Sequence, residues 1–201
     1  MTLLAFGDSL TWGWNPADES RHPRSHRWGP VAAEALGWDL AEEGQNGRTT
    51  ARDEWTGPAD RNGARALPVM LQSHAPLRTV AIMLGTNDLI LLPGTTAIMA
   101  GWGMLRLVQI VQGFPWPAGA APGILLIAPP PLAACANPLP EPHSIAESHE
   151  LAAVYADVAQ QTGAAFLDAG RHVAVSPTDG VHLEADATRL LGLAVADVLG
   201  R

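Results

Sequence analysis

Short apolar runs alternate along this chain with longer segments in which apolar residues recur at helical spacing. The clearest run, at residues 79–84, is continuous, contains β-branched residues and is followed by Gly85. Runs of this kind are typical of strands that are buried on both faces of a parallel sheet. The pattern predicts strands over residues 3–6, 38–41, 79–84, 123–128 and 164–168.

The segments of helical periodicity between these runs predict helices. The helix over 28–36 is expected to stop at Gly37, because glycine commonly closes a helix. In the helix over 61–74, Pro68 is expected to mark an interruption or a start, because proline has no amide hydrogen for an interior turn. Helices are predicted over residues 28–36, 61–74, 95–112, 145–162 and 184–199.

Two segments predict loops. Residues 15–27 are polar and rich in Pro, His and Arg, so they are expected to form an exposed loop. The stretch from Pro129 to about Ser144 begins with three prolines and is long for a connection inside a compact domain. Loops of that length tend to serve a function or an interface.

Strands that alternate with helices imply a parallel sheet with right-handed crossovers and helices on both faces. We therefore predict an α/β protein with a three-layer α/β/α sandwich and a five-stranded parallel sheet. The chain contains no internal repeat and no linker, so residues 1–201 are expected to form a single domain.

Small polar clusters lie at the ends of predicted strands. Because the carboxyl ends of parallel strands face one edge of a sheet, clusters that are distant in sequence are expected to converge there. The clusters are Gly7-Asp8-Ser9, Gly44 to Gly47, Gly85-Thr86-Asn87-Asp88 and Asp179-Gly180-Val181-His182.

Three residues of these clusters fit nucleophilic catalysis. A serine hydroxyl is a poor nucleophile at neutral pH and needs a general base, for which imidazole is well suited. The imidazole in turn needs a carboxylate to hold its tautomer. We expect Ser9 to be the nucleophile, His182 the base and Asp179 the partner of His182.

The same clusters offer hydrogen-bond donors for an oxyanion. Such donors must be in place before negative charge develops on the substrate oxygen. The expected donors are the backbone N–H of Ser9, the backbone N–H of Gly47 and the side-chain amide of Asn87.

Each of these residues alone has a simpler explanation. The tripeptide at Ser9 is also ordinary turn and capping chemistry, and Asn87 is also a common turn residue. Asp179 is also a helix start signal, and His182 is also a capping or core histidine. We expect Asp8 to hydrogen-bond backbone amides of a neighbouring loop rather than to catalyse. The joint appearance of all the clusters favours the catalytic interpretation.

Two aromatic residues follow the candidate nucleophile. Trp12 and Trp14 either line the pocket for the acyl group or alcohol or pack in the core, since both environments favour aromatic side chains. The sequence supports these two interpretations equally.

Composition excludes several functions. The net charge of −8 argues against nucleic acid or an anionic membrane as a partner, because both need a basic patch. All 12 basic residues are arginine, and the absence of lysine excludes a Walker-type phosphate loop and Schiff-base chemistry. A lone cysteine, Cys135, cannot form an intramolecular disulfide and fits a reducing compartment.

No cofactor or metal is expected. His22 and His26 stand four apart, but Pro23 lies between them and no HExxH pattern is present, so a surface loop is favoured over a metal site. The chain shows no apolar run of bilayer length and no signal peptide, which predicts a cytoplasmic protein.

The four polar clusters together resemble the four blocks of the SGNH (GDSL) hydrolases. The matching stretches are Phe6-Gly7-Asp8-Ser9-Leu10, Gly44-Gln45-Asn46-Gly47-Arg48-Thr49, Gly85-Thr86-Asn87-Asp88 and Asp179-Gly180-Val181-His182. The resemblance spans nearly the whole chain and implies the SGNH/flavodoxin-like fold. It also implies the roles assigned above, with Ser9, Asp179 and His182 as the triad and with Ser9, Gly47 and Asn87 as oxyanion donors.

Further stretches look like the bacterial arylesterase and acyltransferase subgroup of that family. They are residues 6–14, 42–44, 48–50, 83–88 and 129–132. The subgroup implies an esterase of small esters that forms an acyl-enzyme on Ser9 and passes the acyl group to water, alcohols or peroxide. It also implies a compact homo-oligomer. One departure is Gly47, where some members carry a residue with a methyl group, so this loop is expected to be more flexible.

Other interpretations remain open. A carbohydrate O-deacetylase would share the fold and the triad, and a non-catalytic SGNH-like binding domain would lack a triad residue. A flavodoxin-like or nucleotide-binding module would need a Gly-rich phosphate turn after the first strand, which this chain lacks.

The apolar stretch 89–93, the helix over 95–112 and the loop over 129–144 also add apolar surface, which favours association into a homo-oligomer. We expect residues 89–93 to form a loop that narrows the mouth of the site together with Trp12, Trp14 and neighbouring subunits, and thereby to favour short acyl chains.

Overall fold

Five strands form one all-parallel sheet in this computed structural model, which describes residues 1–136 and 140–201. The order of the strands in the sheet is β2-β1-β3-β4-β5. The strands are β1 (Thr2–Gly7), β2 (Asp39–Gly44), β3 (Thr79–Met83), β4 (Gly123–Ala128) and β5 (Ala165–Asp168). The predicted α/β fold with a five-stranded parallel sheet is confirmed.

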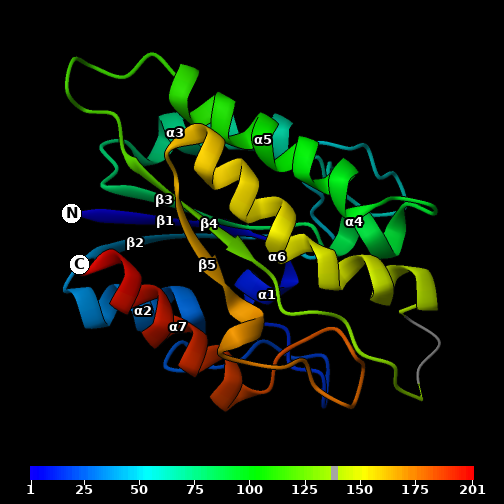
Figure 1. Cartoon of the computed structure of the whole chain (residues 1–201). Coiled ribbons are helices and arrows are strands. Elements are labelled where there is room, and N and C mark those ends of the chain that lie inside the picture. The colour runs from blue at the N-terminus through cyan, green and yellow to red at the C-terminus, as the bar shows by residue number, and fades with distance from the viewer. Residues whose placement is uncertain (137–139) are drawn as a thin grey trace.

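Helices cover both faces of this sheet. Figure 1 shows α3, α5 and α6 on one face and α2 and α7 on the other. The helices are α1 (Ser9–Trp12), α2 (Trp28–Leu36), α3 (Gly63–His74), α4 (Thr86–Leu91), α5 (Ala97–Gly113), α6 (Pro142–Thr162) and α7 (Ala185–Leu199), and a 3₁₀ turn covers Ala169–Arg171.

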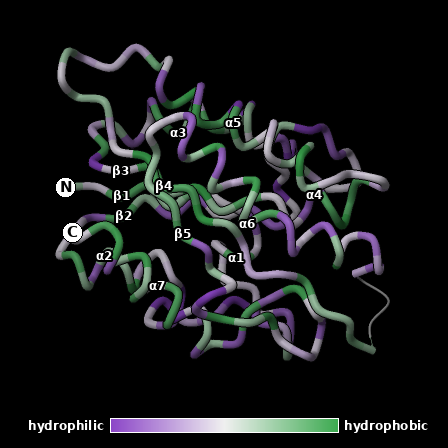
Figure 2. The backbone as a smooth tube through the Cα atoms, in the orientation of Figure 1, coloured by the Kyte–Doolittle hydropathy of each residue, from purple (hydrophilic) through white to green (hydrophobic). Residues whose placement is uncertain are grey.

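The core consists of one apolar layer on each side of the sheet. Along β1, Leu4 and Phe6 point into the layer beneath α3, α5 and α6, whereas Leu3 and Ala5 point toward α2 and α7. Figure 2 shows the hydrophobic residues of β4 in the middle of the molecule. Both faces of the inner strands are buried, which explains why their sequences are continuously apolar rather than alternating.

The strand order reverses direction between β1 and β3. After β1 the chain forms β2, which pairs with one edge of β1. It then forms β3, which pairs with the opposite edge of β1. Open α/β sheets bind ligands at such a topological switch point. Ser9 follows β1 and Asn87 lies in the helix after β3, so the fold brings these two clusters to neighbouring positions at the carboxyl edge of the sheet.

Some element boundaries differ from the prediction. Pro68 lies inside a continuous α3, so the expected interruption or start at this residue is wrong; the helix begins instead after Asn62, whose side chain accepts a hydrogen bond from Ala64 N. The stretch 89–93 is not the expected loop, because residues 89–91 belong to α4 and Leu89 is only 2% exposed. A helix of this length is too short to show periodicity in the sequence.

The two predicted loops are only partly as expected. Segment 15–27 is largely exposed, as predicted. His22 within it is only 5% exposed, so the prediction that this histidine lies on the surface is wrong. The loop from Pro129 ends where α6 begins at Pro142, slightly before the predicted Ser144, and residues 137–139 of that prediction lie outside the described part of the chain.

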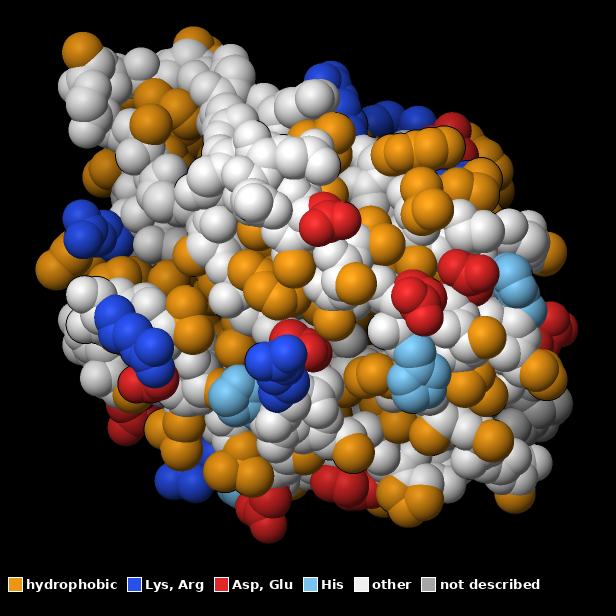
Figure 3. All heavy atoms as spheres, in the orientation of Figure 1, with side chains coloured by type: hydrophobic (Ala, Val, Ile, Leu, Met, Phe, Trp, Pro, Cys, Tyr) orange, Lys and Arg blue, Asp and Glu red, His pale blue; other side chains and the backbone are white. Residues whose placement is uncertain are grey.

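The surface carries mixed charge. On the face in Figure 3, basic side chains lie in small groups among acidic and apolar ones. In the part of the chain that the structure describes, no helix combines the length and apolarity needed to cross a bilayer.

Candidate active site

Ser9 is the first residue of α1, directly after β1. Asp8 caps this short helix, because its Oδ1 accepts a hydrogen bond of 2.9 Å from Leu10 N. The N–H of the first helical residue has no acceptor within the helix. The turn therefore places both the hydroxyl and the N–H of Ser9 at the carboxyl edge of the sheet, with the residue only 7% exposed.

Asp179 and His182 form one compact turn ahead of α7. The Oδ1 atom of Asp179 accepts hydrogen bonds of 2.9 Å from Val181 N and from His182 N, and its Oδ2 lies 2.6 Å from His182 Nδ1. Burial by itself raises the pKa of Asp179, but the hydrogen bonds from His182 and Val181 outweigh it and lower the pKa below 3.8. The carboxylate is thus held ionised and orients the imidazole.

Gly180 makes this turn possible. Its φ of +71° favours glycine, and a Cβ at this position would lie 2.0 Å from the carbonyl oxygen of Ala133. The Gly180 carbonyl also accepts a hydrogen bond of 3.0 Å from Ala133 N. The loop after β4 therefore fixes the position of the turn that carries Asp179 and His182.

The third contact completes a Ser-His-Asp arrangement. His182 Nε2 lies 2.8 Å from Ser9 Oγ, while Nδ1 faces Asp179. In this geometry Nδ1–H donates to the carboxylate, and Nε2 is free to accept the proton of Ser9. The structure brings together all three residues of the predicted triad.

Asn87 also lies at the carboxyl edge of the sheet, but its side-chain amide already donates hydrogen bonds to other groups. Its Nδ2 atom lies 3.1 Å from Asp8 Oδ2 and 3.1 Å from the carbonyl oxygen of Arg48. An amide nitrogen has two hydrogens, so both are directed at these acceptors. Donation to an oxyanion therefore requires Asn87 to share or to exchange one of these bonds.

The pKa of Asp8 reflects its position beneath the site. Burial raises its pKa from 3.8 to about 7, and the hydrogen bond from Leu10 N and the charges of His182 and Arg48 only partly oppose this effect. Asp8 does accept from a backbone amide, but the amide is that of Leu10 in α1 rather than one of a neighbouring loop, and its second partner is the side-chain amide of Asn87.

Gly47 lies in the loop after β2, which packs against the first cluster. Arg48 Nη1 donates to Gly7 O at 2.8 Å, and Gln45 N donates to the same carbonyl at 3.1 Å. The φ of Gly47 is +81°, and a Cβ here would lie 2.5 Å from the guanidinium carbon of Arg61. Glycine therefore suits the positive φ at this position and leaves room for the side chain of Arg61.

Asp88 is a site residue to which sequence reasoning gave no role. Its carboxylate accepts hydrogen bonds from Thr50 N at 2.8 Å and from Thr50 Oγ1 at 2.6 Å, so it ties α4 to the loop that carries Gly47. Burial raises its pKa to about 6. Asp88 stood in the quoted cluster, but only the fold shows that Thr50 is its partner.

His22 is a second residue that sequence reasoning missed. Its Nε2 lies 3.0 Å from the carbonyl oxygen of Leu183, which follows His182, so the loop over 15–27 supports the histidine turn. Nothing in the sequence connects His22 with Leu183, because they are far apart along the chain.

No group of His, Cys, Asp or Glu suited to a metal ion occurs among the described residues.

The two tryptophans have different surroundings. The ring of Trp14 stacks on His182, with centroids 5.5 Å apart, and lines a hollow of about 240 Å³ beside the triad. Trp12 lies 6.0 Å from Trp14, and the guanidinium of Arg21 lies 5.2 Å from its centroid. Trp14 is therefore the aromatic residue of this hollow. Leu89, expected at the mouth, is instead buried in the core.

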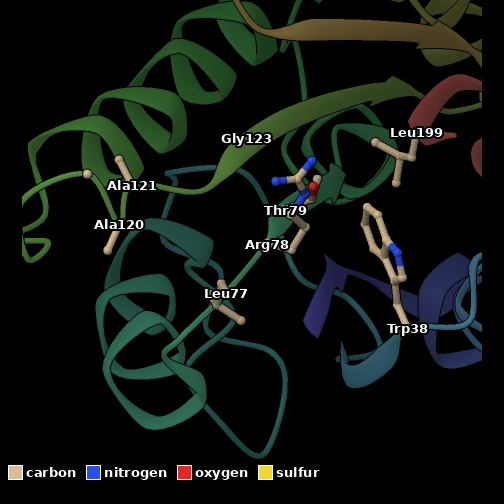
Figure 4. Close-up of a pocket in the computed structure, with 9 residues that line it drawn as sticks. Trp38, Leu77, Arg78, Thr79, Ala120, Ala121, Gly123 and Leu199 are labelled. Carbon is tan, nitrogen blue, oxygen red and sulfur yellow. The ribbon is translucent and has the colours of Figure 1, made fainter. Parts of the chain in front are cut away.

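A larger hollow of about 410 Å³ lies at the other end of the strands. Figure 4 shows its lining, which includes Trp38, Arg78 and Leu199. Thr79 and Gly123 begin β3 and β4, so this hollow is at their amino ends, away from Ser9. It contains none of the candidate catalytic residues.

Comparison with known proteins identifies a family and several solved structures that this chain resembles. The model of the GDSL-like lipase/acylhydrolase family matches residues 5–190. No curated protein is similar enough to this chain to count as a match.

Several solved structures share the fold over nearly their full length. One, described as an arylesterase from Agrobacterium tumefaciens, is 47% identical with a TM-score of 0.94, covering 99% of this chain and 98% of its own. The aryl esterase of M. smegmatis is 37% identical with a TM-score of 0.92, covering 99% and 98%. A carbohydrate acetylesterase family member from Sinorhizobium meliloti is 40% identical with a TM-score of 0.94, covering 98% and 96%.

Proposed function

We propose that this chain, which belongs to the GDSL-like lipase/acylhydrolase family and is a carboxylic ester hydrolase, acts on small short-chain acyl or aryl esters through an acyl-enzyme on Ser9. The observation that carries the proposal is the pair of contacts at His182. Its Nε2 lies 2.8 Å from Ser9 Oγ, and its Nδ1 lies 2.6 Å from Asp179 Oδ2.

The reaction follows from this geometry. As Ser9 Oγ attacks the ester carbonyl carbon, His182 Nε2 takes the hydroxyl proton, and Asp179 stabilises the imidazolium. The tetrahedral intermediate collapses when His182 returns that proton to the leaving alkoxide, which departs as the alcohol. Water then attacks the acyl-enzyme by the same steps and releases the acid and Ser9.

The oxyanion of the intermediate is proposed to receive hydrogen bonds from Ser9 N–H, Gly47 N–H and the Asn87 amide. In the structure, the Asn87 amide donates hydrogen bonds to Asp8 and to the Arg48 carbonyl. One of these two bonds lengthens when the developing negative charge offers a stronger acceptor.

The experiment that tests the esterase proposal is a pre-steady-state assay with p-nitrophenyl acetate. An acyl-enzyme gives a burst of p-nitrophenol close to one per active site when deacylation is the slower step. A serine-directed organophosphonate is expected to abolish turnover and to add its mass to the peptide that contains Ser9. Full activity after labelling at Ser9 would refute the proposal.

The preference for short acyl chains is supported by the similarity to a structure described as a carbohydrate acetylesterase family member, because the acetyl group is a short acyl group. A series of p-nitrophenyl esters from acetyl to octanoyl is expected to show kcat/KM falling with chain length. A rise toward octanoyl would contradict this preference.

Acyl transfer to alcohols or peroxide is the second part of the proposal. Water and an alcohol compete for the acyl-enzyme, and the outcome depends on which is held better beside His182. The Trp14 ring beside His182 offers an apolar surface for an alcohol. Vinyl acetate with benzyl alcohol in buffer is expected to yield benzyl acetate early, and acetate as the sole product would exclude transfer.

A carbohydrate O-deacetylase is the second candidate. The observation that favours it is the 40% identity over nearly the whole chain with a structure described as a carbohydrate acetylesterase family member. The discriminating measurement compares kcat/KM for an acetylated xyloside with that for phenyl acetate. A higher value for the xyloside would favour the deacetylase.

We propose that the chain forms a homo-oligomer that works on small esters with water or an alcohol as acceptor. The support is an exposed apolar surface on α5, where Ile98 is 57% and Trp102 is 66% exposed. These two side chains lie about one helical turn apart on the same side of α5. Isolated apolar residues are common on monomers, but adjacent large ones favour an interface.

A further inference from the structure

The backbone at Glu19 adopts a conformation that its residue type disfavours. Its φ is +61°, and among the described residues no other non-glycine residue has a positive φ. Side chains on L-residues clash with the backbone in this region, which is why glycine, asparagine or aspartate usually occupies it. Strained positions of this kind cluster at functional sites, so the surroundings of Glu19 are informative.

A closely bonded turn holds Glu19 in this conformation. Glu19 N donates to Asn15 O at 2.9 Å, and Asn15 N donates to Ser20 O at 2.9 Å. Asp18 Oδ1 accepts from the Asn15 side chain at 2.7 Å and from Ser20 Oγ at 2.6 Å. The turn is therefore fixed by its other members, and the side chain of Glu19 makes none of these bonds.

Glu19 lines the hollow beside the triad. Trp14, Asp179, Val181 and His182 line the same space of about 240 Å³. The strained residue thus belongs to the small cavity in which the candidate general base lies, although its side chain is exposed at the rim.

The position of His182 shows which part of an ester this hollow receives. In acylation the imidazole gives its proton to the leaving alcohol, and in transfer it takes a proton from the accepting alcohol. The alcohol must therefore lie against His182 in both steps. The hollow that flanks His182 is therefore the candidate space for the alcohol group.

Glu19 and Asp179 are the two acidic residues of the described lining, and Asp18 beside Glu19 lies outside it. Of these two, Asp179 is committed to His182. The nearest arginine along the chain, Arg21, is paired with Glu42 at 2.9 Å and lies over Trp12. An alcohol group that enters the hollow therefore meets one carboxylate that the triad does not use.

We propose that Glu19 is a specificity residue that makes the hollow beside the triad favour cationic leaving groups and acceptors over anionic ones. The inference rests on the proposed esterase function, because it needs His182 to exchange a proton with the alcohol. The strained backbone keeps the carboxylate at the rim, and Coulomb attraction or repulsion then biases which alcohol group is held beside His182.

The test uses three aryl acetates of similar shape. They are phenyl acetates with a meta trimethylammonium, a meta tert-butyl or a meta carboxylate group, of which the first two are isosteric. The measured quantities are the ratios of kcat/KM for the charged esters to kcat/KM for the neutral ester. Each ratio is compared between proteins, so differences in leaving-group reactivity cancel.

In Glu19→Gln, the cation-to-neutral ratio is expected to fall about three- to tenfold and the anion-to-neutral ratio to rise by a similar factor, as for unit charges several ångströms apart in a largely aqueous medium. Raising the salt to about 1 M is expected to shrink both effects in the parent protein, because exposed charges are then screened. Glu34→Gln, an exposed carboxylate on α2 outside the hollow, is the matched control and should leave both ratios unchanged.

A second variant separates charge from backbone strain. Glu19→Gly removes the carboxylate and suits the positive φ, so its two ratios should match those of Glu19→Gln. Ratios that stay at the parent values in both variants would overturn the role of Glu19 while leaving the esterase proposal intact. A folded parent protein that hydrolyses none of the three esters would instead refute the esterase proposal.

Discussion

Ser9 Oγ and His182 Nε2 lie 2.8 Å apart, although 173 positions separate these residues in the sequence. The contact joins the end of β1 to the turn before α7, and it is the link on which the proposed chemistry depends. Asp179 holds the other side of the imidazole, so the orientation of the ring is fixed from both sides.

Ser9→Ala tests this contact directly. Without the hydroxyl, only substrate binding and the oxyanion donors remain, so kcat for p-nitrophenyl acetate is expected to fall by several orders of magnitude. The urea unfolding curve should stay close to that of the parent protein. More than about a tenth of the activity in a folded variant would remove Ser9 from the mechanism.

Asn87→Ala tests the oxyanion role against a purely structural one. As an oxyanion donor, Asn87 acts on the transition state, so kcat should fall about a hundred- to a thousandfold with little change in KM. If Asn87 only bridges Asp8 and the Arg48 carbonyl, stability should fall instead while the remaining folded protein turns over normally. Measuring kcat, KM and unfolding on one preparation separates the two roles.

Asp88→Asn tests the effect of the buried carboxylate on stability. The folded pKa of Asp88, about 6, lies above an unfolded value of about 3.9, so the folded state holds the proton more tightly. The stability from this group is therefore fully present below about pH 4 and is lost as the pH rises through about 6. Asparagine does not titrate and can keep both bonds to Thr50, with its oxygen accepting from Thr50 N and its amide donating to Oγ1.

The free energy of unfolding of Asp88→Asn relative to the parent protein is thus expected to increase by about 2–3 kcal/mol between pH 4 and pH 7. Urea unfolding at several pH values measures this difference, and the exposed Asp157→Asn is the control. A difference that stays constant with pH would contradict the raised pKa.

Gly180→Ala tests the turn that carries Asp179 and His182. A Cβ there would lie 2.0 Å from Ala133 O at a φ of +71°, so a loss of about 2–4 kcal/mol in stability is expected. Activity should fall at least tenfold, because the turn must shift. Gly94→Ala is the matched control, since Gly94 has a φ of +75° with no atom within 4 Å of its added Cβ. Gly94→Ala should lower the free energy of unfolding by only about 1–2 kcal/mol.

Trp102→Glu tests the proposed homo-oligomer. Sedimentation of the parent protein at micromolar concentration is expected to give a mass above that of the 21.1 kDa chain, and a charge at this exposed position should shift the equilibrium toward the monomer. Glu150→Gln on α6 controls for changes in surface charge. A parent protein that sediments as a monomer would contradict the proposed homo-oligomer.

The sequence by itself determined the order of the elements and selected the residues of the candidate triad. Continuous apolar runs such as residues 79–84 can be buried only in the middle of a covered sheet, and polar residues after such runs necessarily reach its carboxyl edge. These are local properties of the chain, so Ser9 and Asn87 could be selected without coordinates. Asp179 and His182 lie well beyond the end of β5 at Asp168, and they are selected by their spacing and by the family resemblance. The short helices α1 and α4 could not be predicted, because they are too short to show a period.

The tertiary structure decided which residues support the site and what they contact. The sequence does not indicate that Asp88 bonds Thr50, that His22 bonds the carbonyl after His182, or that both hydrogens of the Asn87 amide are engaged. Each of these contacts joins segments whose distance is set by the packing of helices on the sheet. The same holds for Glu19, whose positive φ and place in the hollow depend on the folding of a polar loop against the histidine turn.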